Sequence, residues 1–569
     1  MAAQLLVQSE TEPGVSGGNL KPVEGRPGSF IEKWLNNNLT GIALVVVAAG
    51  LGSRLWAASG RYLNPDEALH YMVINQPSAF LAYKASLQEA HPPLLYLLLY
   101  FWHFLGRSEL MLRLPSVLAG AAFCWFTFKW MGLFFGRRAS LIGVVIATFS
   151  PAMINLSAEL RQYALLLFCM AAALYFLGRG LQENSSRDIW CFSVFLYLAI
   201  LSHYSAVFFA ITIGVYVIVR IAGSPTPRRL ISAWLVGQLG AVAIYGFLYW
   251  TQVSKATSNI QYWEIPFSQY YFHWQNGDGD LFFFLKENTS KIIVYLFKQE
   301  YVSQAMLGFI IAGVVLLFIR GLVPPRGRPR SCHLGILVTL PFLAAWGASI
   351  AGVYPYIGSR HTIFLAPFAI AAASYLLAAV SREKVWPGLA IAVVLMAASF
   401  SSEDPATARI SNDNQRRTLM VGALDFIHRS VPRNEAILSD LQGSVVLPYY
   451  LCGPREMIRF DKSHGDFSDF SCDGYSVLGE NSRIWKLHAG NFGSEFKKMV
   501  RDHALKPGDR VWVFQTGWGT NLDVELPGYS RQFRCLTPKS FGTNITVIPF
   551  VIGPDFSPVT PIKTCGAAG

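Results

Sequence analysis

Long apolar runs recur along this chain and leave it few ways to fold. A run of roughly 17 to 25 apolar residues can cross the hydrocarbon core of a bilayer as a helix. About eleven such windows can be read along the chain. They lie near residues 39–57, 115–134, 139–156, 163–178, 189–202, 204–219, 230–250, 302–319, 334–352, 361–380 and 386–401. The fifth and sixth meet at Ser202 to Tyr204, where one bent element is an alternative to two spans.

The composition supports a membrane protein. Apolar residues make up 52% of the 569 residues and charged residues only 14%, more apolar surface than a soluble core needs. The predicted fold class is a polytopic α-helical membrane protein of about 11 transmembrane helices, followed by a soluble α/β domain. We expect residues 1–36 to be a disordered tail, 37–401 the transmembrane domain and 402–569 the soluble domain.

Basic residues set the predicted orientation, because Lys and Arg near span ends stay on the cytoplasmic side. A cytoplasmic N-terminus makes the alternation consistent. The inner segments then hold Lys21, Arg26, Lys33, Arg137, Arg138, Arg179, Arg187, Arg220, Arg228, Arg229, Arg320, Arg326, Arg328, Arg330, Arg382 and Lys384. The outer regions are 58–114, 157–162, 203–204, 251–301, 353–360 and everything from about 402 onward. The net charge of +12 is therefore mainly a topology signal, and no nucleic-acid motif accompanies it.

The segment from His91 to Gly106 is apolar enough to pass for a short span. If it crossed, every later basic loop would move to the outside. We therefore expect a helix lying along the outer membrane interface, with Pro92 and Pro93 in its first turn. The first 36 residues lack the apolar core of a signal peptide, so we expect the first span to act as the insertion signal.

From about Ser401 the composition becomes that of a soluble domain. Helical spacing at 416–431 and 444–451 alternates with strand-like runs at 435–440, 510–516 and 544–550, which favours a small α/β domain. A further strand at 456–460 and a helix at 493–505 are expected. Four cysteines of this region, Cys452, Cys472, Cys535 and Cys565, can form up to two disulfides on the oxidising side. The other four cysteines lie in or beside the spans and are expected to be packing residues.

Ionisable residues gather in the predicted outer loops, where charges next to a membrane mark functional sites. The candidates are Asp66, Glu67, Lys84, His91, Arg113, Glu159, Arg161, His203, Glu264, Arg360 and His361. Each residue also has a purely structural interpretation. Asp66 follows Pro65 and suits the start of a helix, and Arg360 can be an interfacial anchor. Together they provide a carboxylate that can take a proton from a hydroxyl and cations that can stabilise a phosphate leaving group.

Several motifs carry a family resemblance. "LNPDEALHY", "HPPLLYLLL", "RLPSVLAG", "SAELRQYALLLF", "LSHYSAVFF" and "SRHTIFLAPFAIAAAS" stand in this order between residues 63 and 374. In motif order and spacing the chain resembles bacterial membrane glycosyltransferases of the GT-C superfamily. Within it, the chain is similar to the group of protein O-mannosyltransferases, lipid A aminoarabinose transferases and Rgt-type lipopolysaccharide sugar transferases. The resemblance covers roughly residues 40–380 and excludes the region after 400.

The resemblance implies an inverting transfer of a sugar from a polyprenyl-phosphate donor to a hydroxyl of a glycan, lipid or protein at the outer face of the cytoplasmic membrane. Asp66 matches the family's catalytic acid, expected to act as general base, and Glu67 completes its Asp-Glu pair. Glu159 matches the acid of the second outer loop, where relatives often carry Asp. Lys84, His91, Arg161 and Arg360 are candidates for binding the donor phosphate; His361 replaces the family's usual Tyr. Tyr163, His203, Tyr204 and His361 are candidate substrate-binding residues.

Two other functions stay open at this stage. A transporter or flippase could line a translocation route with the same charges, but no internal repeat is visible and the charges collect at the outer ends of the spans. A membrane anchor for a working C-terminal domain is the other alternative, although that domain shows no catalytic constellation. We expect no essential metal, with a cation at Gly277 to Asp280 ("GDGD") as the alternative to a turn.

Overall fold

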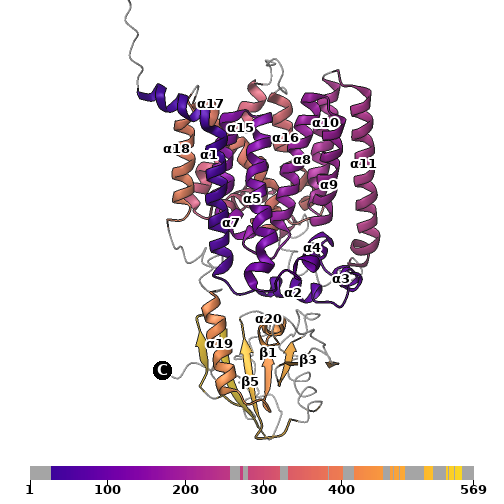
Figure 1. The fold of residues 1–569 in the computed structure, drawn as a ribbon, viewed down its shortest axis with the longest axis vertical. Helices are drawn as coiled ribbons and strands as arrows, with labels where there is room; N and C mark the ends of the chain where they lie inside the picture. The colour runs from indigo at the N-terminus through magenta and orange to yellow at the C-terminus, as the bar shows by residue number, and fades with distance from the viewer. Residues whose placement is uncertain are drawn as a thin grey trace, which may run out of the picture.

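The computed structural model describes residues 27–223, 225–256, 270–272, 280–320, 331–381, 384–401, 416–452, 462–464, 467–472, 474–480, 501, 505–516, 533–535, 537–543 and 545–553. Two bodies are visible: a helical bundle and a smaller domain built on a sheet (Figure 1). Three short helices lie between them. The predicted strand at 456–460, most of the predicted helix at 493–505, Glu264 and Gly277 to Gly279 fall outside the described residues.

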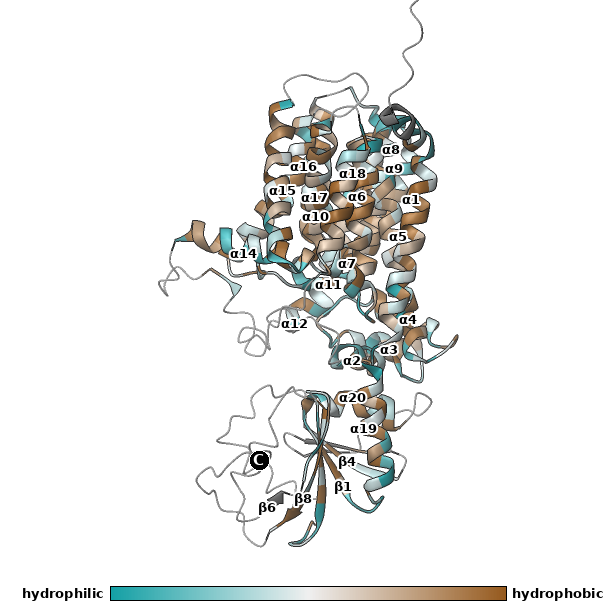
Figure 2. Cartoon of the chain, turned by 90° about the vertical axis from the view of Figure 1, so that its left-hand side faces the viewer, coloured by the Kyte–Doolittle hydropathy of each residue, from teal (hydrophilic) through white to brown (hydrophobic). Residues whose placement is uncertain are grey.

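The bundle consists of long apolar helices. They are α1 (Pro27–Ser59), α5 (Glu109–Phe134), α6 (Arg137–Phe149), α7 (Pro151–Ser157), α8 (Tyr163–Glu183), α9 (Ser186–Ser202), α10 (Ala206–Ala222), α11 (Arg228–Leu248), α15 (Glu300–Arg320), α16 (Ser331–Ile350), α17 (Ala366–Val380) and α18 (Trp386–Ala398). A π-helical turn (Tyr249–Val253) and α12 (Ser254–Ala256) continue α11, and a 3-10 turn (Arg360–Leu365) precedes α17. Apolar residues cover much of the bundle (Figure 2).

The predicted membrane fold is confirmed. Within the described residues, seven helices are long and apolar enough to cross a membrane, or eight if the bent pair α6 and α7 forms one span. The other predicted windows are the shorter helices α9, α10 and α18, of 17, 17 and 13 residues. The fifth and sixth windows form separate helices, because His203 adopts an extended conformation between α9 and α10.

Close packing holds the bundle together. Gly313 of α15 faces α17, where a β-carbon would approach the carbonyl oxygen of Ala372 to 2.2 Å. Small residues at such positions let helix backbones approach in a membrane, where water supplies no hydrophobic driving force. The α15 and α17 backbones can therefore pack directly against each other.

A break between α6 and α7 directs the chain toward the end of the bundle that faces the sheet. The two helices bend by 60° at Ser150, because Pro151 has no N–H for the carbonyl of Ala147. The buried Arg54 of α1 donates to the carbonyl oxygens of Thr148 at 3.1 Å and Ala147 at 3.4 Å. A guanidinium group thus replaces the missing backbone donor, and α7 is free to lead into residues 158–162.

The segment between α1 and α5, predicted as the first outer loop, forms three short helices. They are α2 (Pro65–Ile74), α3 (Ala79–Ser86) and α4 (Leu94–Trp102), at the end of the bundle that faces the sheet (Figure 1). With nine residues, α4 is too short to cross a bilayer, as predicted for His91 to Gly106. It begins after Pro92 and Pro93, with Pro93 at its N-cap, so the prolines are not in its first turn as predicted. Its position along the membrane interface stays a prediction. A helix that the sequence analysis did not anticipate, α14 (Leu281–Phe297), extends sideways from the same end of the bundle (Figure 2).

The C-terminal domain is built on a mixed sheet. Its strands are β1 (Ala436–Ser439), β2 (Lys462–His464), β3 (Phe467–Cys472), β4 (Tyr475–Glu480), β5 (Arg510–Gln515), β6 (Phe533–Cys535), β7 (Lys539–Phe541) and β8 (Ile545–Ile552). The order is β2-β3-β4-β1-β5-β8-β6, with β7 also on β8. β1 runs parallel to β4 and β5, and the other pairs are antiparallel. The predicted helices are α19 (Arg417–Ser430) and α20 (Leu441–Leu451).

Cysteine use follows the predicted division. Cys452 after α20 is disulfide-bonded, which agrees with an oxidising environment for this domain. Cys124, Cys169, Cys191 and Cys332 of the bundle are free thiols. The side chains of the other three C-terminal cysteines fall outside the described parts of the chain.

Helix α20 attaches the C-terminal domain to the segment between α1 and α5. The Tyr450 hydroxyl accepts a hydrogen bond from the backbone N–H of Leu63 at 2.8 Å and donates one to Glu109. Glu109 also pairs with Arg417 at 2.6 Å, and Tyr71 of α2 packs edge-on against Tyr449. The C-terminal domain therefore holds the residues that immediately precede α2.

Removing the Tyr450 hydroxyl should weaken this attachment. In Tyr450→Phe, the buried N–H of Leu63 loses its acceptor, so the free energy of unfolding should fall by about 1 to 3 kcal/mol. Thermal unfolding in detergent measures the change. Tyr249→Phe is the control, because Tyr249 is 53% exposed. Equal unfolding temperatures for the two variants would contradict the proposed attachment.

Candidate active site

Helix α2 begins with a capping box. The Asn64 side chain accepts the N–H of Glu67 at 3.0 Å, and the Glu67 carboxylate accepts the N–H of Asn64 at 2.9 Å. Pro65 occupies the first helical position, where its missing N–H costs nothing. The acid pair therefore starts a helix, as the sequence predicts, and the cap fixes the directions of both acids.

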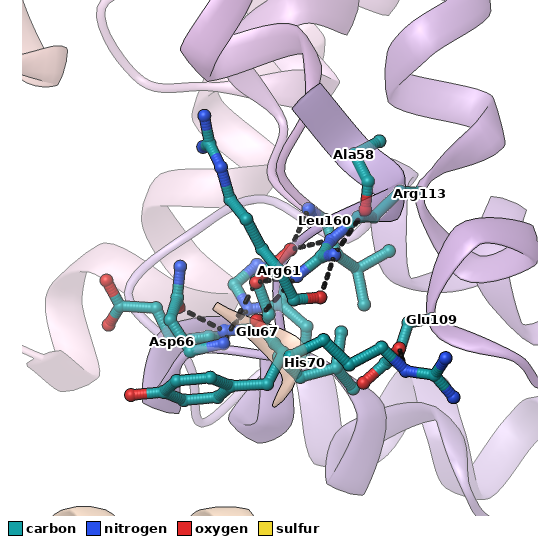
Figure 3. A network of polar contacts seen from close by, with 12 residues as sticks. Ala58, Arg61, Asp66, Glu67, His70, Glu109, Arg113 and Leu160 are labelled. Carbon is teal, nitrogen blue, oxygen red and sulfur yellow. Dashed lines mark hydrogen bonds and ion pairs between the residues drawn. The ribbon is translucent and has the colours of Figure 1, made fainter. Parts of the chain in front are cut away.

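The Glu67 carboxylate accepts several hydrogen bonds from within the protein. It also accepts the N–H of Leu160 at 2.7 Å and two bonds from Arg113, from Nε and from Nη2, each at 2.7 Å. The other three Arg113 N–H groups reach the carbonyl oxygens of Ala58, Arg61 and Tyr62. Figure 3 shows this network. Both side chains are 1% exposed, and the Arg113 guanidinium holds the pKa of Glu67 below its ordinary value despite burial.

Asp66 lies between two arginines from distant parts of the chain. Its Oδ2 is 2.7 Å from Nη1 of Arg360 and 3.5 Å from Nη1 of Arg161. Burial alone would raise the pKa of Asp66, but these guanidinium groups lower it well below its ordinary value. Asp66 is therefore a carboxylate at neutral pH. It is 33% exposed, so another molecule can reach it.

The two arginines lie in turns between helices. Arg161 stands in the turn between α7 and α8, and its carbonyl accepts the Ser116 hydroxyl at 3.0 Å. Arg360 opens the 3-10 turn before α17, where Ser359 accepts the N–H of His361 at 3.3 Å. Arg161 is 4% exposed, whereas Arg360 is 32% exposed. A fixed cation and an accessible cation thus face the same carboxylate.

Aromatic rings form a wall beside this carboxylate. The ring of His91 lies 5.4 Å from that of His203, and Tyr163 lies 5.3 Å from His203 and 6.5 Å from His361. His70 of α2 stacks on Tyr96 at 4.8 Å and donates from Nδ1 to the Asp66 carbonyl at 2.7 Å. Two buried polar atoms here, His91 Nδ1 and Tyr96 Oη, have no hydrogen-bond partner among the described residues. Polar groups of this kind can recognise sugar hydroxyls.

The histidines of this wall are neutral at neutral pH. Burial, with a smaller effect of Arg161, lowers the pKa of His70 to about 3. Burial, His361 and Arg161 lower the pKa of His203 to about 3, and the pKa of His91 also falls well below its ordinary value. His91 can therefore hold a phosphate only through a hydrogen bond, because its ring carries no charge.

The chain is similar to one family model and to several solved structures. A model described as dolichyl-phosphate-mannose-protein mannosyltransferase matches residues 90–250. No curated protein matches the chain in sequence. The solved structure of ArnT from Cupriavidus metallidurans, bound to undecaprenyl phosphate, is similar with a TM-score of 0.52 at 15% identity, over 91% of this chain and 100% of ArnT. The chain thus has the fold of the ArnT structure, and its residues 90–250 are similar to this mannosyltransferase family.

Two other GT-C structures are less similar. The apo oligosaccharyltransferase from Archaeoglobus fulgidus has a TM-score of 0.47 at 10% identity, over 84% of this chain and 70% of that one. The S. cerevisiae Pmt1-Pmt2 complex has a TM-score of 0.31 at 16% identity, over 37% and 33%. The family match begins after Asp66, so the interpretation of the acid pair depends on the geometry above.

The remaining predicted site residues lie in different places. Glu159 lies in the turn with Arg161, and burial and Glu67 raise its pKa, against the effect of Arg360, Arg161 and Arg61. Tyr204 donates to Gln252 at 2.9 Å, and Gln252 donates to the carbonyl of Ser86 at 2.9 Å. Through Gln252, Tyr204 thus supports the segment that precedes His91. It makes none of the ring contacts of the aromatic wall. Lys84 is exposed on α3 and forms no ion pair with a described residue.

Sequence reasoning missed three residues near the site. Glu89 is partly buried, and burial, opposed by Arg161, raises its pKa to about 7. His70 and Gln252 also belong to the site or its support. Sequence signals existed for two of them: His70 follows Asp66 by one helical turn, and Glu89 precedes the His-Pro-Pro motif by two residues. Gln252 carried no such signal, because its partners are 48 to 166 residues away.

Neutralising Glu67 should unfold this region. Glu67→Gln leaves the buried Arg113 without a counter-ion, which should cost about 3 to 5 kcal/mol of unfolding free energy. Glu287→Gln on α14 is the matched control, because its pair with Lys291 is exposed and should contribute about 0.3 to 0.5 kcal/mol. Chemical unfolding in detergent compares the two variants. Equal losses would show that the Glu67 network does not hold the fold.

Acid should destabilise the protein through its neutral histidines. In the unfolded chain a histidine binds a proton below about pH 6.5, whereas folded His70 and His203 do so only near pH 3. Their stabilising contribution is complete above pH 6.5 and falls toward pH 3, with a slope of up to about 1.4 kcal/mol per pH unit for each residue. His203→Gln should have a smaller slope than wild type in pH-dependent unfolding. An unchanged slope would refute the neutral state of His203.

Proposed function

We propose that the enzyme transfers a sugar from a polyprenyl-phosphate donor to an acceptor hydroxyl, with inversion at the sugar and Asp66 as general base. The observation that carries this proposal is the position of an ionised, accessible carboxylate between Arg161 and Arg360. A carboxylate can take a proton and two cations can bind a phosphate. The site thus holds both groups that such a transfer requires.

The reaction balances with these groups alone. Asp66 takes the proton of the acceptor hydroxyl, and the acceptor oxygen forms a bond to the anomeric carbon of the sugar. The bond between that carbon and the phosphate oxygen breaks on the opposite side. The polyprenyl phosphate leaves with the electron pair, and Arg161 and Arg360 stabilise its negative charge. Because these guanidinium groups supply the positive charge, the proposal requires no metal ion.

Donor binding should make Asp66 a better base. With only the two arginines nearby, the Asp66 pKa lies far below neutrality, which makes it a weak proton acceptor. A donor phosphate would draw the arginines toward itself and reduce their effect on Asp66. The carboxylate then becomes more basic only when a donor is present. This order would also limit unproductive protonation of Asp66 in the free enzyme.

The similar proteins support a lipid-borne donor. The ArnT structure holds undecaprenyl phosphate, and the matching family model names a dolichyl-phosphate mannose enzyme. A polyprenyl chain can stay in the bilayer while its phosphate reaches the arginines at the end of the bundle. The basic segments in the sequence assign this end to the outer face of the cytoplasmic membrane. The reaction would then occur outside the cytoplasm, with the N-terminus inside.

The test is the exchange of Asp66 for a residue of equal size. Asp66→Asn should reduce transfer by about 10² to 10⁴-fold, the usual contribution of a general base. Purified protein is assayed against a panel of polyprenyl-phosphate sugars with mass-spectrometric product analysis. Undecaprenyl phosphate binding should stay near wild type, because Arg161 and Arg360 hold the phosphate in this proposal. The unfolding temperature should fall, because both arginines lose a paired carboxylate, while the cooperative unfolding transition should persist, because Asn still fits the start of α2.

Asp280→Asn provides the matched control, since Asp280 caps α14 outside the site and Asn caps equally well. Its transfer rate should match wild type. Wild-type transfer by Asp66→Asn would refute Asp66 as the base. Movement of the lipid-linked sugar across a sealed vesicle membrane without a new glycosidic bond would instead support a flippase.

A further inference from the structure

Helix α14 packs against the segment that carries Arg360. The two backbones meet at Gly358, two residues before Arg360, where an added β-carbon would lie 2.2 Å from the carbonyl oxygen of Lys291 on α14. A contact below 3.0 Å with a backbone atom forces one of the two elements to move. Gly358 therefore lets the segment lie directly on the backbone of α14, an approach that the missing side chain permits.

A buried hydrogen bond beside this contact joins the same two elements. The hydroxyls of Thr289 on α14 and Tyr356 are 2.8 Å apart, and Tyr356 is 0% exposed. A buried hydroxyl without a partner costs free energy, so this bond favours one register between α14 and the segment. On the other side of Arg360, the Tyr354 hydroxyl donates to the carbonyl oxygen of His361 at 2.8 Å. These contacts fix the backbone before and after Arg360.

The other end of α14 contacts the break that leads to Arg161. Ser150 stands between α6 and α7, is 1% exposed and donates from Oγ to the carbonyl oxygen of Leu296 at 2.7 Å. Leu296 belongs to the last turn of α14, whose carbonyl groups lack a donor within the helix. Helix α7 and then Arg161 follow Ser150 along the chain. The same helix, which runs sideways from the bundle (Figure 2), therefore contacts the segment before each arginine.

The two arginines act at short distances, so small displacements of their backbone matter. Asp66 Oδ2 is 2.7 Å from Nη1 of Arg360 and 3.5 Å from Nη1 of Arg161. Arg360 is 32% exposed, whereas Arg161 is 4% exposed, so the placement of Arg360 depends more on its backbone than on packing of its side chain. A misplacement of about 1 Å can cost an enzyme about 10²-fold in rate.

We propose that α14 positions the donor-binding arginines and that Gly358 is a positioning residue that acts through Arg360. This inference rests on the proposed function, in which Arg360 binds the donor phosphate. The contact at Gly358 sets where Arg360 stands relative to Asp66, and the bond at Ser150 holds the start of the path to Arg161. Gly358 has no side chain with which to bind a ligand, so its effect on donor binding passes through the residues that it places.

Gly358→Ala tests the proposal through donor binding. The added β-carbon pushes the segment away from α14, so the Kd of the purified protein for undecaprenyl phosphate should rise about tenfold, the factor that 1.4 kcal/mol of lost binding represents. Gly347→Ala is the matched control, because Gly347 lies on α16 and a β-carbon there meets no described atom within 4 Å. Its Kd should equal that of wild type.

A double-mutant cycle separates positioning from general destabilisation. In Arg360→Gln the side chain that Gly358 places is missing, so adding Gly358→Ala should not raise the Kd further. Thr289→Val, which removes the bond to Tyr356 and keeps the size of the side chain, should raise the Kd in wild type and have no effect beside Arg360→Gln. Equal tenfold effects of Gly358→Ala in both backgrounds would overturn the proposal, and so would a wild-type Kd in both Gly358→Ala and Thr289→Val.

Amide hydrogen exchange of residues 359–362, measured by mass spectrometry, needs no donor. Exchange should be faster in Gly358→Ala and Thr289→Val than in wild type, and unchanged in Gly347→Ala. If wild type failed to bind undecaprenyl phosphate, the proposed donor would be refuted, and the exchange would still decide whether α14 holds the backbone at Arg360. Equal exchange in wild type and in both variants would overturn the positioning role.

Discussion

The buried ion pair of Glu67 and Arg113 is the interaction on which the end of the bundle that faces the sheet depends. All five N–H groups of Arg113 are used, and four donors meet the Glu67 carboxylate. One pair therefore ties the end of α1, the start of α2, helix α5 and the turn at Leu160 into a single unit. Both charges are out of water, so neither could be tolerated there without the other.

Because this unit is fixed, the neighbouring Asp66 can stay accessible to another molecule. The two acids are adjacent, but the helical start turns them in different directions, one into a saturated network and one toward Arg161 and Arg360. The break at Pro151, supported by Arg54, brings Arg161 to this place. The C-terminal domain contributes through Tyr450, which holds the backbone just before α2. The geometry of the candidate site thus depends on structural contacts made by four separate segments.

Much of the fold could be predicted from local sequence, because membrane crossing requires long apolar runs and helix starts have recognisable residues. The windows, the interfacial α4 and the helical start at Asp66 all follow from such local patterns. Helix α14 was missed because its Lys and Glu residues interrupt the apolar run. The β3–β4 hairpin was missed because its strands alternate weakly, and antiparallel pairing across Cys472 and Tyr475 supplies their order. Gln252 could not be found, since its role is defined by contacts far away in sequence.

The sequence by itself determined a polytopic membrane protein whose outer segments carry acids, arginines and histidines, because hydropathy and charge act along the chain. Only the tertiary structure decided which of those groups meet. It placed Glu67 on Arg113, Asp66 between two arginines and Tyr204 away from the aromatic wall, and it left Lys84 exposed. The physical reason is that electrostatic and hydrogen-bonding energies depend on distance in space and on burial. Residues 66, 161 and 360 acquire a common chemistry only when folding excludes water between them.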